Sequence, residues 1–143
     1  MIALAYALVL ALTAIAAVHF YWGAGGFWPA ADEAGLIDTV LGDWRARTMP
    51  PRPLTFVVAI AIEAAALVAA FLSLRVGGAI DALFSMAGAV LCLVFLARFS
   101  LGYLGFWRRR YNRQPFARLD RLVYSPLCLA IAAGFALLVA ERL

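Results

Sequence analysis

Three ionisable side chains interrupt the long apolar stretches of this 143-residue chain: His19, Glu63 and Arg98. A charge at the centre of a membrane costs about 2.5–3.5 kcal/mol even on insertion scales, so such residues usually pair or serve a function. Glu63 follows Leu54 by nine residues, and Arg98 precedes Trp107 by nine. At about 1.5 Å per helical residue, both side chains reach a similar depth. The spacing therefore predicts an available Glu63–Arg98 ion pair, which either locks the helices together or acts in a site.

A second polar group opens the last apolar stretch: Tyr124, Ser125 and Cys128. Ser125-Pro126 is typical of an N-cap followed by proline in the first helical position, which predicts a helix beginning near Ser125. Its free amides and positive dipole end would then lie near His19 and favour an anionic or carbonyl-bearing ligand. The structural alternative is that His19 hydrogen-bonds the Tyr124 hydroxyl and joins the first helix to the last.

Several chemistries do not fit these residues. One histidine cannot supply both axial ligands of a haem, and no cluster of metal ligands is apparent, so we expect no metal and no other cofactor. Cys92 and Cys128 are predicted at different depths, too far apart for a disulfide. There is also no phosphate-binding loop and no recognised nucleophile motif. Whether the chain is an enzyme stays open.

Four apolar segments must position these side chains. With 66% hydrophobic and 14% charged residues, the chain has more apolar surface than a soluble domain of this length can bury. Each segment is long enough to cross a hydrocarbon layer, which takes about 20 helical residues: 2–22, 54–74, 79–106 and 124–141. The Gly77-Gly78 pair suits a tight reversal between the second and third. The predicted fold class is all-α, a polytopic membrane protein with one four-transmembrane-helix domain over residues 1–143.

The arginines predict the orientation. Loops 23–53 and 107–121 share one side of the membrane and carry nine arginines, whereas the side with both termini carries only Arg75 and Arg142. The positive-inside rule therefore places both loops in the cytoplasm and both termini outside. Because the arginines lie between membrane spans, we expect membrane lipids as partners and no nucleic acid. A homo-oligomer is a further expectation.

The two cytoplasmic loops differ in charge. Residues 32–44 are acidic and predict a short amphipathic helix. Its apolar side is formed by Leu36, Ile37, Val40, Leu41 and Trp44. Because an acidic helix is a poor ligand for an anionic leaflet, it is expected either to lie over the bundle mouth against the arginines of 107–121 or to form a solvated connector. The arginine-rich loop is interpreted as a topology anchor and lipid headgroup contact, in preference to a dedicated substrate site.

Three stretches carry a resemblance: HFYWGAGGFW (19–28), ARFSLGYLGFWRR (97–109) and FARLDRLVYSPLCL (116–129). They resemble a bacterial family of small integral membrane proteins of unknown function, over nearly the whole chain. Its members carry a His-Xaa-Tyr-Trp-Xaa-Xaa-Gly-Gly-Xaa-Trp run, an arginine in the third helix and a Tyr-Ser-Pro-Leu-Cys run. Many have proline where this chain has Gly105. The matching residues are His19, Tyr21, Trp22, Gly25, Gly26, Trp28, Arg98, Tyr124, Ser125, Pro126, Leu127 and Cys128, with Phe116 and Asp120 before the last run. The resemblance implies a four-helix membrane protein and supplies no activity.

These observations leave three functional hypotheses. The first is a protein that binds a small amphipathic or lipid-like ligand in a polar site near the cytoplasmic leaflet. The second is a small proton-coupled transporter that uses Glu63, and the third is a structural or partner subunit without a ligand. The candidate ligand-binding residues are His19, Tyr21, Trp22, Trp28, Glu63, Arg98, Tyr124, Ser125 and Cys128.

Overall fold

All regular secondary structure in the described residues is helical. The structure, a computed structural model, describes residues 1–74 and 76–142, so Arg75, predicted on the outer side, lies outside the described residues. The helices are α1 (Ile2–Gly23), α2 (Glu33–Leu36), α3 (Arg52–Leu72), α4 (Gly78–Leu101), α5 (Gly105–Arg110), α6 (Phe116–Leu119) and α7 (Ser125–Ala140). Two π-helical turns, η1 (Ile37–Leu41) and η2 (Asp120–Tyr124), directly follow α2 and α6.

Four helical segments are long and apolar enough to cross a membrane. They are α1, α3, α4 and the continuous stretch Phe116–Ala140, which joins α6, η2 and α7. Each has the roughly 20 residues that a hydrocarbon layer of about 30 Å requires. The predicted fold class is confirmed: the chain is all-α, with four long apolar helices and a short helix between the first two. It is a multi-pass membrane protein.

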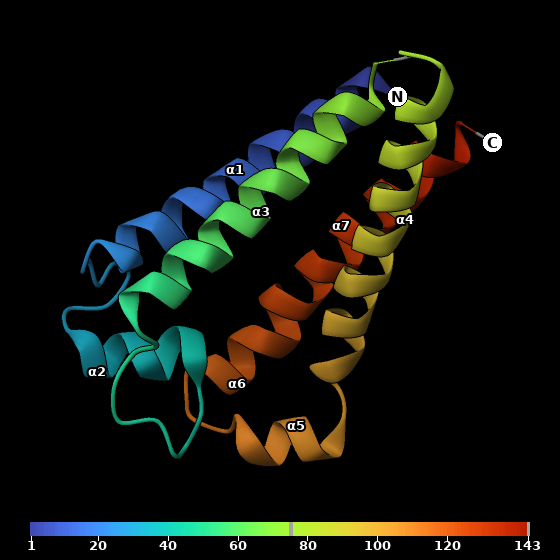
Figure 1. Cartoon of the computed structure of the whole chain (residues 1–143). Coiled ribbons are helices and arrows are strands. Elements are labelled where there is room, and N and C mark those ends of the chain that lie inside the picture. The colour runs from blue at the N-terminus through green and yellow to red at the C-terminus, as the bar shows by residue number, and fades with distance from the viewer. Residues whose placement is uncertain (75, 143) are drawn as a thin grey trace.

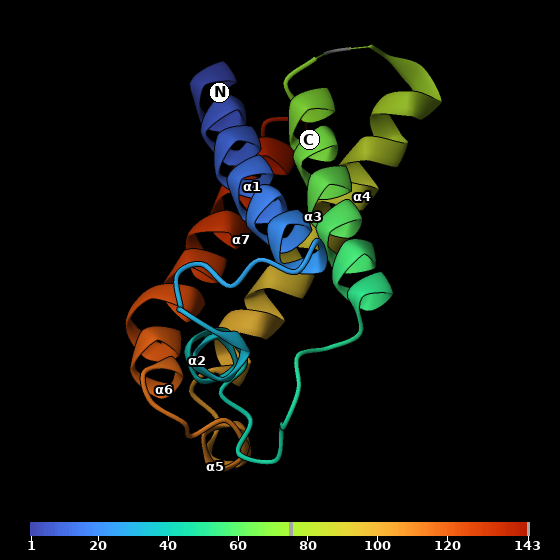
Figure 2. The same cartoon turned by 90° about the vertical axis from the view of Figure 1, so that its left-hand side faces the viewer.

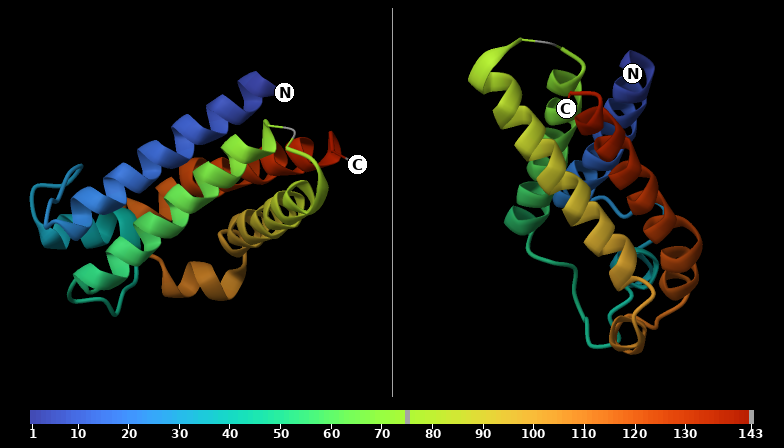
Figure 3. Two further views of the ribbon diagram at one scale, coloured as in Figure 1. Left: turned by 45° about the horizontal axis from the view of Figure 1, so that its top comes forward. Right: turned by 90° about the vertical axis from the view of Figure 1, so that its right-hand side faces the viewer.

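The spans pack as two pairs. In Figure 1, α1 lies along α3 while α4 crosses α7, and the two pairs meet through contacts of α3 with α4 and of α1 with α7. Figure 2 shows α1 and α3 side by side in front of the second pair. Of the four spans α4 is the least buried, and Figure 3 shows it at the edge of the molecule. The core between the pairs contains Ala5, Leu8, Leu12, Ala65, Ala66, Ala69, Leu72, Ile131, Phe135 and Leu138.

Small residues allow the helices to approach closely. A Cβ on Gly134 would lie 2.9 Å from the Leu8 side chain, and one on Gly88 would lie 2.8 Å from both Leu72 and Val139. Association of membrane helices depends on such van der Waals packing, because lipid is as apolar as the side chains. The glycines thus bring α1 against α7, and α4 against both α3 and α7.

The third span ends at Leu101, so the predicted boundary at residue 106 is wrong. The amides of Gly102, Tyr103 and Leu104 bond to carbonyls three residues back, which closes a tight turn. The short helix α5 then runs crosswise to α4 at that end of the molecule (Figure 1). This turn moves the last apolar residues of the predicted span out of the membrane helix.

The fourth span begins at Phe116, so the prediction of a helix start and N-cap at Ser125 is also wrong. Ser125 has α-helical backbone angles, and its amide bonds to the Asp120 carbonyl five residues back, inside a continuous helix. Continuing that pattern, the Arg121 carbonyl would need the amide of Pro126, which has none. The Tyr103 hydroxyl donates to this carbonyl instead, at 2.9 Å. Free helix-start amides therefore do not lie at Ser125.

The first loop contains the predicted short helix. The Asp32 side chain caps α2 by accepting from the Gly35 amide at 2.8 Å, and Leu36 and Ile37 are buried. Gly42 ends η1 with a left-handed backbone (φ 68°). Trp44 was predicted on the same apolar side, but it lies beyond this break and is 49% exposed.

Both termini and the Gly77-Gly78 turn lie at one end of the molecule, and α2, α5 and α6 lie at the other (Figure 1). The predicted reversal is confirmed, because both glycines have positive φ angles of 89° and 65°. Arg142 closes this end: it donates to the carbonyls of Leu72 and Leu74 and pairs with Asp81 at 3.1 Å. It thereby satisfies carbonyls left open at the end of α3.

Candidate functional site

Arg98 lies at the centre of a polar cluster between α4 and the fourth span. Its guanidinium donates to Asp120 Oδ1 at 2.6 Å and to Ser125 Oγ at 3.4 Å. Ser125 Oγ also donates to Asp120 Oδ1, at 3.3 Å, and Trp107 Nε1 donates to Asp120 Oδ2 at 3.1 Å. The Asp120 side chain is only 4% exposed. The cluster therefore joins α4, α5 and α7 through one buried carboxyl group.

The π turn places this carboxyl group. In an α-helix, residues five apart point about 140° away from each other, whereas a turn with i to i+5 hydrogen bonds brings them to nearly the same side. Asp120 and Ser125 are the ends of such a turn, and both face Arg98. The π turn thus allows Asp120 and Ser125, which are five residues apart, to contact Arg98 together.

The predicted Glu63–Arg98 pair is wrong. Arg98 pairs across to the fourth span, and Glu63 instead accepts a hydrogen bond from the Thr13 hydroxyl at 3.2 Å, between α3 and α1. A similar depth in the membrane is necessary for an ion pair, but it is not sufficient. Glu63 lies on α3, which packs along α1, whereas Arg98 lies on α4, which packs on α7. Glu63 is not brought to the polar cluster.

The predicted contact between His19 and Tyr124 is also wrong. His19 Nδ1 lies 2.8 Å from the Ile15 carbonyl of its own helix, and its ring lies against Trp22 with centroids 4.9 Å apart. The Tyr124 hydroxyl donates to the Thr39 carbonyl of η1 at 3.1 Å. Tyr124 therefore joins the fourth span to the first loop, and not to α1.

The aromatic residues after His19 shape the end of α1. Trp22 Nε1 donates to the Trp28 carbonyl at 2.7 Å, which folds residues 23–28 back onto the helix. A side chain on Gly26 would overlap the Tyr21 ring. Tyr21 and Trp28 line a largely apolar depression of about 400 Å³ with Ala17 and Val18. Aromatic side chains of this kind are typical of the membrane–water interface.

Cys128 is a half-buried free thiol one helical turn beyond Ser125. Among the described residues, it takes no part in the hydrogen bonds of Arg98. Of the nine predicted residues, the cluster contains Arg98 and Ser125. Tyr124 is their neighbour in η2, and His19, Tyr21, Trp22, Trp28 and Glu63 belong to α1, its following turn and α3.

Two ion pairs hold the first loop to the arginine-rich loop. Asp38 pairs with Arg113 at 2.8 Å, and Asp43 pairs with Arg110 at 2.7 Å. The acidic segment thus contacts the arginines of 107–121, as one of the two sequence-based alternatives expected. We call these two pairs the loop clasp. Burial raises the pKa of Asp43, but hydrogen bonds from the Arg45 amide and Arg110 outweigh it and bring the pKa below its ordinary value.

The loop clasp is expected to weaken in acid. Because the pKa of Asp43 is lowered in the folded chain, its contribution to stability is complete above the ordinary Asp pKa and is lost as pH falls through the lowered value. Hydrogen exchange of residues 36–44, corrected for intrinsic rates, should therefore be slow at neutral pH and accelerate below about pH 4. In Asp43→Asn these amides should exchange faster at neutral pH and respond less to acid. Equal pH profiles would contradict this role.

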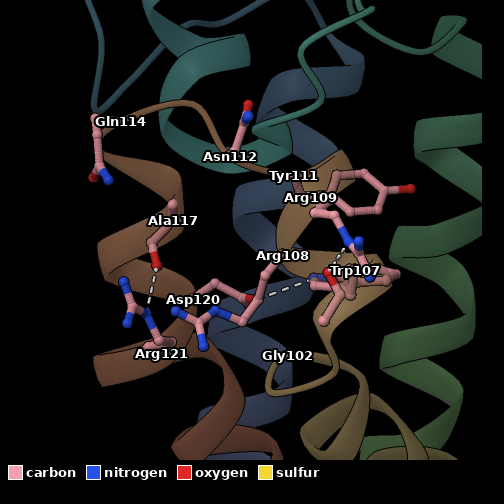
Figure 4. Close-up of a pocket in the computed structure, with 11 residues that line it drawn as sticks. Gly102, Trp107, Arg108, Arg109, Tyr111, Asn112, Gln114, Ala117, Asp120 and Arg121 are labelled. Atoms are coloured by element: carbon pink, nitrogen blue, oxygen red, sulfur yellow. Dashed lines mark hydrogen bonds between the residues drawn. The ribbon is translucent and has the colours of Figure 1, made fainter.

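A pocket of about 470 Å³ lies between α5 and the start of the fourth span. Figure 4 shows Trp107 and Arg109 on one side of it, with Ala117 and Arg121 on the other. Asp120 and Gly102 also line it, so the pocket adjoins the Arg98 cluster. The volume is within the range of about 300–1,000 Å³ that is usual for small-molecule sites.

Three arginines line this pocket: Arg108, Arg109 and Arg121. Within residues 1–74 and 76–142, none of them forms an ion pair, whereas their neighbours Arg110 and Arg113 do. In the described part of the chain, Arg109 and Arg121 donate only to backbone carbonyls one turn back, at 3.3 and 3.4 Å. The pocket therefore carries an excess of positive charge.

Gly102 keeps the cluster and the pocket adjacent. A Cβ at this position would overlap Ser125 Oγ, so Gly102→Ala is expected to displace Ser125 and to destabilise the protein by about 1–3 kcal/mol. Gly105→Ala is the matched control, because its nearest neighbour is 3.8 Å away. Thermal unfolding in detergent should separate the two variants. Equal melting temperatures of the two variants would show that Ser125 can move away from residue 102 without loss of stability.

Sequence reasoning did not identify Asp120 as the partner of Arg98, nor the arginine-lined pocket as a site. The signal was present in FARLDRLVYSPL, where an acidic residue stands two positions before an apolar run. Because residues 107–121 were predicted to form a loop, Asp120 was placed outside the membrane helices. The sequence therefore did not indicate that Asp120 and Arg98 lie at the same depth.

The comparisons with known proteins place these features in a family. The family described as "Protein of unknown function (DUF3995)" matches residues 12–135. No curated protein and no solved structure matches the chain. The matched region includes most of the four spans, the whole Arg98 cluster and the pocket. The chain is therefore a member of the DUF3995 family.

Proposed function

We propose that this protein binds the anionic headgroup of an amphipathic, lipid-like molecule in the pocket between α5 and the fourth span. The observation that carries the proposal is that three pocket-lining arginines, Arg108, Arg109 and Arg121, have no carboxylate partner in the described part of the chain. Guanidinium groups bind phosphate and carboxylate through strong, often bidentate, charge-assisted hydrogen bonds. Asp120 does not cancel this charge, because it already pairs with Arg98.

The surroundings favour a ligand with an apolar part. Exposed hydrophobic side chains flank the pocket in the sequence on both sides: Tyr103, Leu104 and Phe106 at the start of α5, and Leu122 and Val123 in η2. Large exposed apolar groups of this kind mark membrane contact. When the headgroup lies among the arginines, the apolar part of the ligand would thus lie against these residues.

The orientation belongs to the same proposal. We infer that the chain lies in a bacterial inner membrane with both termini outside and the pocket on the cytoplasmic side. The excess of arginine in the loops at the α2, α5 and α6 end supports this orientation. The ligand would then enter from the cytoplasmic leaflet, which is rich in anionic lipid.

Native mass spectrometry of the full chain, titrated with phosphatidylglycerol or phosphatidylcholine, tests the proposal. Three substitutions, Arg108→Gln, Arg109→Gln and Arg121→Gln, remove the pocket charge. A matched variant loses the same charge outside the pocket: Arg45→Gln, Arg47→Gln and Arg118→Gln, which also form no ion pair within the described residues. The pocket variant should retain phosphatidylglycerol at least about tenfold more weakly than the matched variant, because even one charge-assisted hydrogen bond is worth that much.

Two results would oppose the proposal. Equal retention by both triple variants would mean that anionic lipid responds only to the general charge of the loops. Retention of phosphatidylcholine as strong as that of phosphatidylglycerol would remove the anionic specificity. Either result would favour the structural or partner-subunit hypothesis, in which the polar cluster serves assembly alone.

A further inference from the structure

The floor of the pocket carries an unused hydrogen-bond acceptor. Asp120 Oδ1 accepts from Arg98 and Ser125, while Oδ2 accepts from Trp107 alone among the described residues, at 3.1 Å. A carboxylate offers about four lone-pair sites, two on each oxygen. One site on Oδ2 therefore remains, at a residue that lines the pocket.

Gly102 lies beside this oxygen. The position that a Gly102 Cβ would occupy lies 3.2 Å from Asp120 Oδ2, and both residues line the pocket. The Ser125 hydroxyl already occupies this position, so a side chain at residue 102 would displace Ser125 and disturb Asp120. The glycine thus keeps Asp120 at the lining of the pocket, where a small polar group of a ligand would meet it.

Two carboxamides complete the polar lining. Asn112 and Gln114 line the pocket, and neither side chain hydrogen-bonds to another group in residues 1–74 or 76–142. Each carboxamide offers both donors and an acceptor, which suits a hydroxyl group. A carboxylate acceptor and two carboxamides beside three arginines are not needed for an anion alone. A phosphate oxygen without a proton has nothing to donate to Asp120 Oδ2, whereas a hydroxyl group there would donate to it.

We propose that the pocket selects a phosphate esterified to a polyol: the phosphate lies among Arg108, Arg109 and Arg121, and a free hydroxyl of the polyol donates to Asp120 Oδ2. The inference rests on the proposed function and names the chemistry of its ligand. Two sources share that chemistry, a polyol phosphate headgroup of a lipid and a free polyol phosphate.

The test compares two lipids of equal charge, phosphatidylglycerol and phosphatidylethanol, of which only the first has free hydroxyls. The full chain is titrated with an equal mixture, and the retained lipids are identified by native mass spectrometry. Wild type should retain phosphatidylglycerol about three- to tenfold better, the value of one net hydrogen bond. The double substitution Asn112→Ala with Gln114→Ala, which leaves the buried cluster intact, should reduce this preference without abolishing binding of either lipid.

The outcomes separate the two proposals. Equal retention of both lipids by wild type, with loss of both in the pocket arginine variant, would overturn the polyol inference and keep the anion site. Equal retention that does not depend on the arginines would overturn both. A preference for phosphatidylglycerol supports the inference. Glycerol phosphate is then added to distinguish the two sources of the ligand. Displacement of the retained lipid indicates a free polyol phosphate, and no displacement indicates a lipid headgroup.

Discussion

Asp120→Ala is expected to lower the free energy of unfolding by about 3–5 kcal/mol. The substitution leaves Arg98, whose side chain is only 29% exposed, without its carboxylate at the end of a membrane helix. Trp107 and Ser125 lose their acceptor at the same time, so α5 is freed from the fourth span. Unfolding of the purified protein in mixed micelles, with increasing denaturing detergent, measures this loss.

The exposed pair provides the matched control. Asp43→Ala also removes a carboxylate from an arginine, but Arg110 is 42% exposed and such pairs are worth about 0–1 kcal/mol. The double variant Arg98→Met with Asp120→Leu should recover most of the stability, because it buries no unpaired charge. If Asp120→Ala costs no more than Asp43→Ala, the cluster does not hold α4 and α5 to the fourth span.

Gly42→Ala is expected to cost about 2–5 kcal/mol and to free the first loop. The backbone at Gly42 is left-handed (φ 68°), which costs an L-residue about 1–2 kcal/mol. The added methyl group would also overlap the ring of buried Phe116, and such overpacking typically costs a further 1–3 kcal/mol. Thermal unfolding gives the total, and trypsin cleavage after Arg45 or Arg47 reports the release of the loop.

Gly77→Ala separates these two contributions. Gly77 also has a positive φ (φ 89°, ψ 162°), in an extended region that is essentially confined to glycine and costs another residue about 1–3 kcal/mol. No described atom lies within 4 Å of an added Cβ there, so only this backbone cost applies. It also lies at the opposite end of the molecule from the loop clasp. Trypsin sensitivity at Arg45 should therefore rise in Gly42→Ala and not in Gly77→Ala. A similar rise in both would mean that Phe116 does not hold the loop.

The number of membrane helices could be predicted because it depends on the length of apolar runs alone. Their ends could not, for two opposite reasons. Residues 102–104 contain no charge and no proline, and the apolar Gly105-Phe106-Trp107 follows them, so hydropathy did not reveal the turn that ends α4. Residues 116–123 are interrupted by charges, so they were assigned to a loop although they form the first turns of the fourth span.

The pairing within the site was harder to predict. Counting residues from a helix end gives the depth of Arg98, but not the direction in which it points around the helix axis. Glu63 satisfied the depth criterion and belongs to the other helix pair, while Asp120 was brought to Arg98 by a π turn. Ser125-Pro126 has the local composition of a helix start, and the same π turn allowed the helix to pass through it.

The π turn at Asp120–Tyr124 also makes the length of this segment matter more than its composition. A π turn contains one residue more than an α-helix needs for the same rise, so deleting a single residue there would restore regular α-helix. Every residue before the deletion would then rotate by about 100° relative to Ser125 and those after it. Phe116 would turn away from Gly42, and the carboxyl group would turn away from Arg98. The segment should consequently accept many substitutions among its exposed residues but no insertion or deletion, and chains that keep the site should keep its residue count.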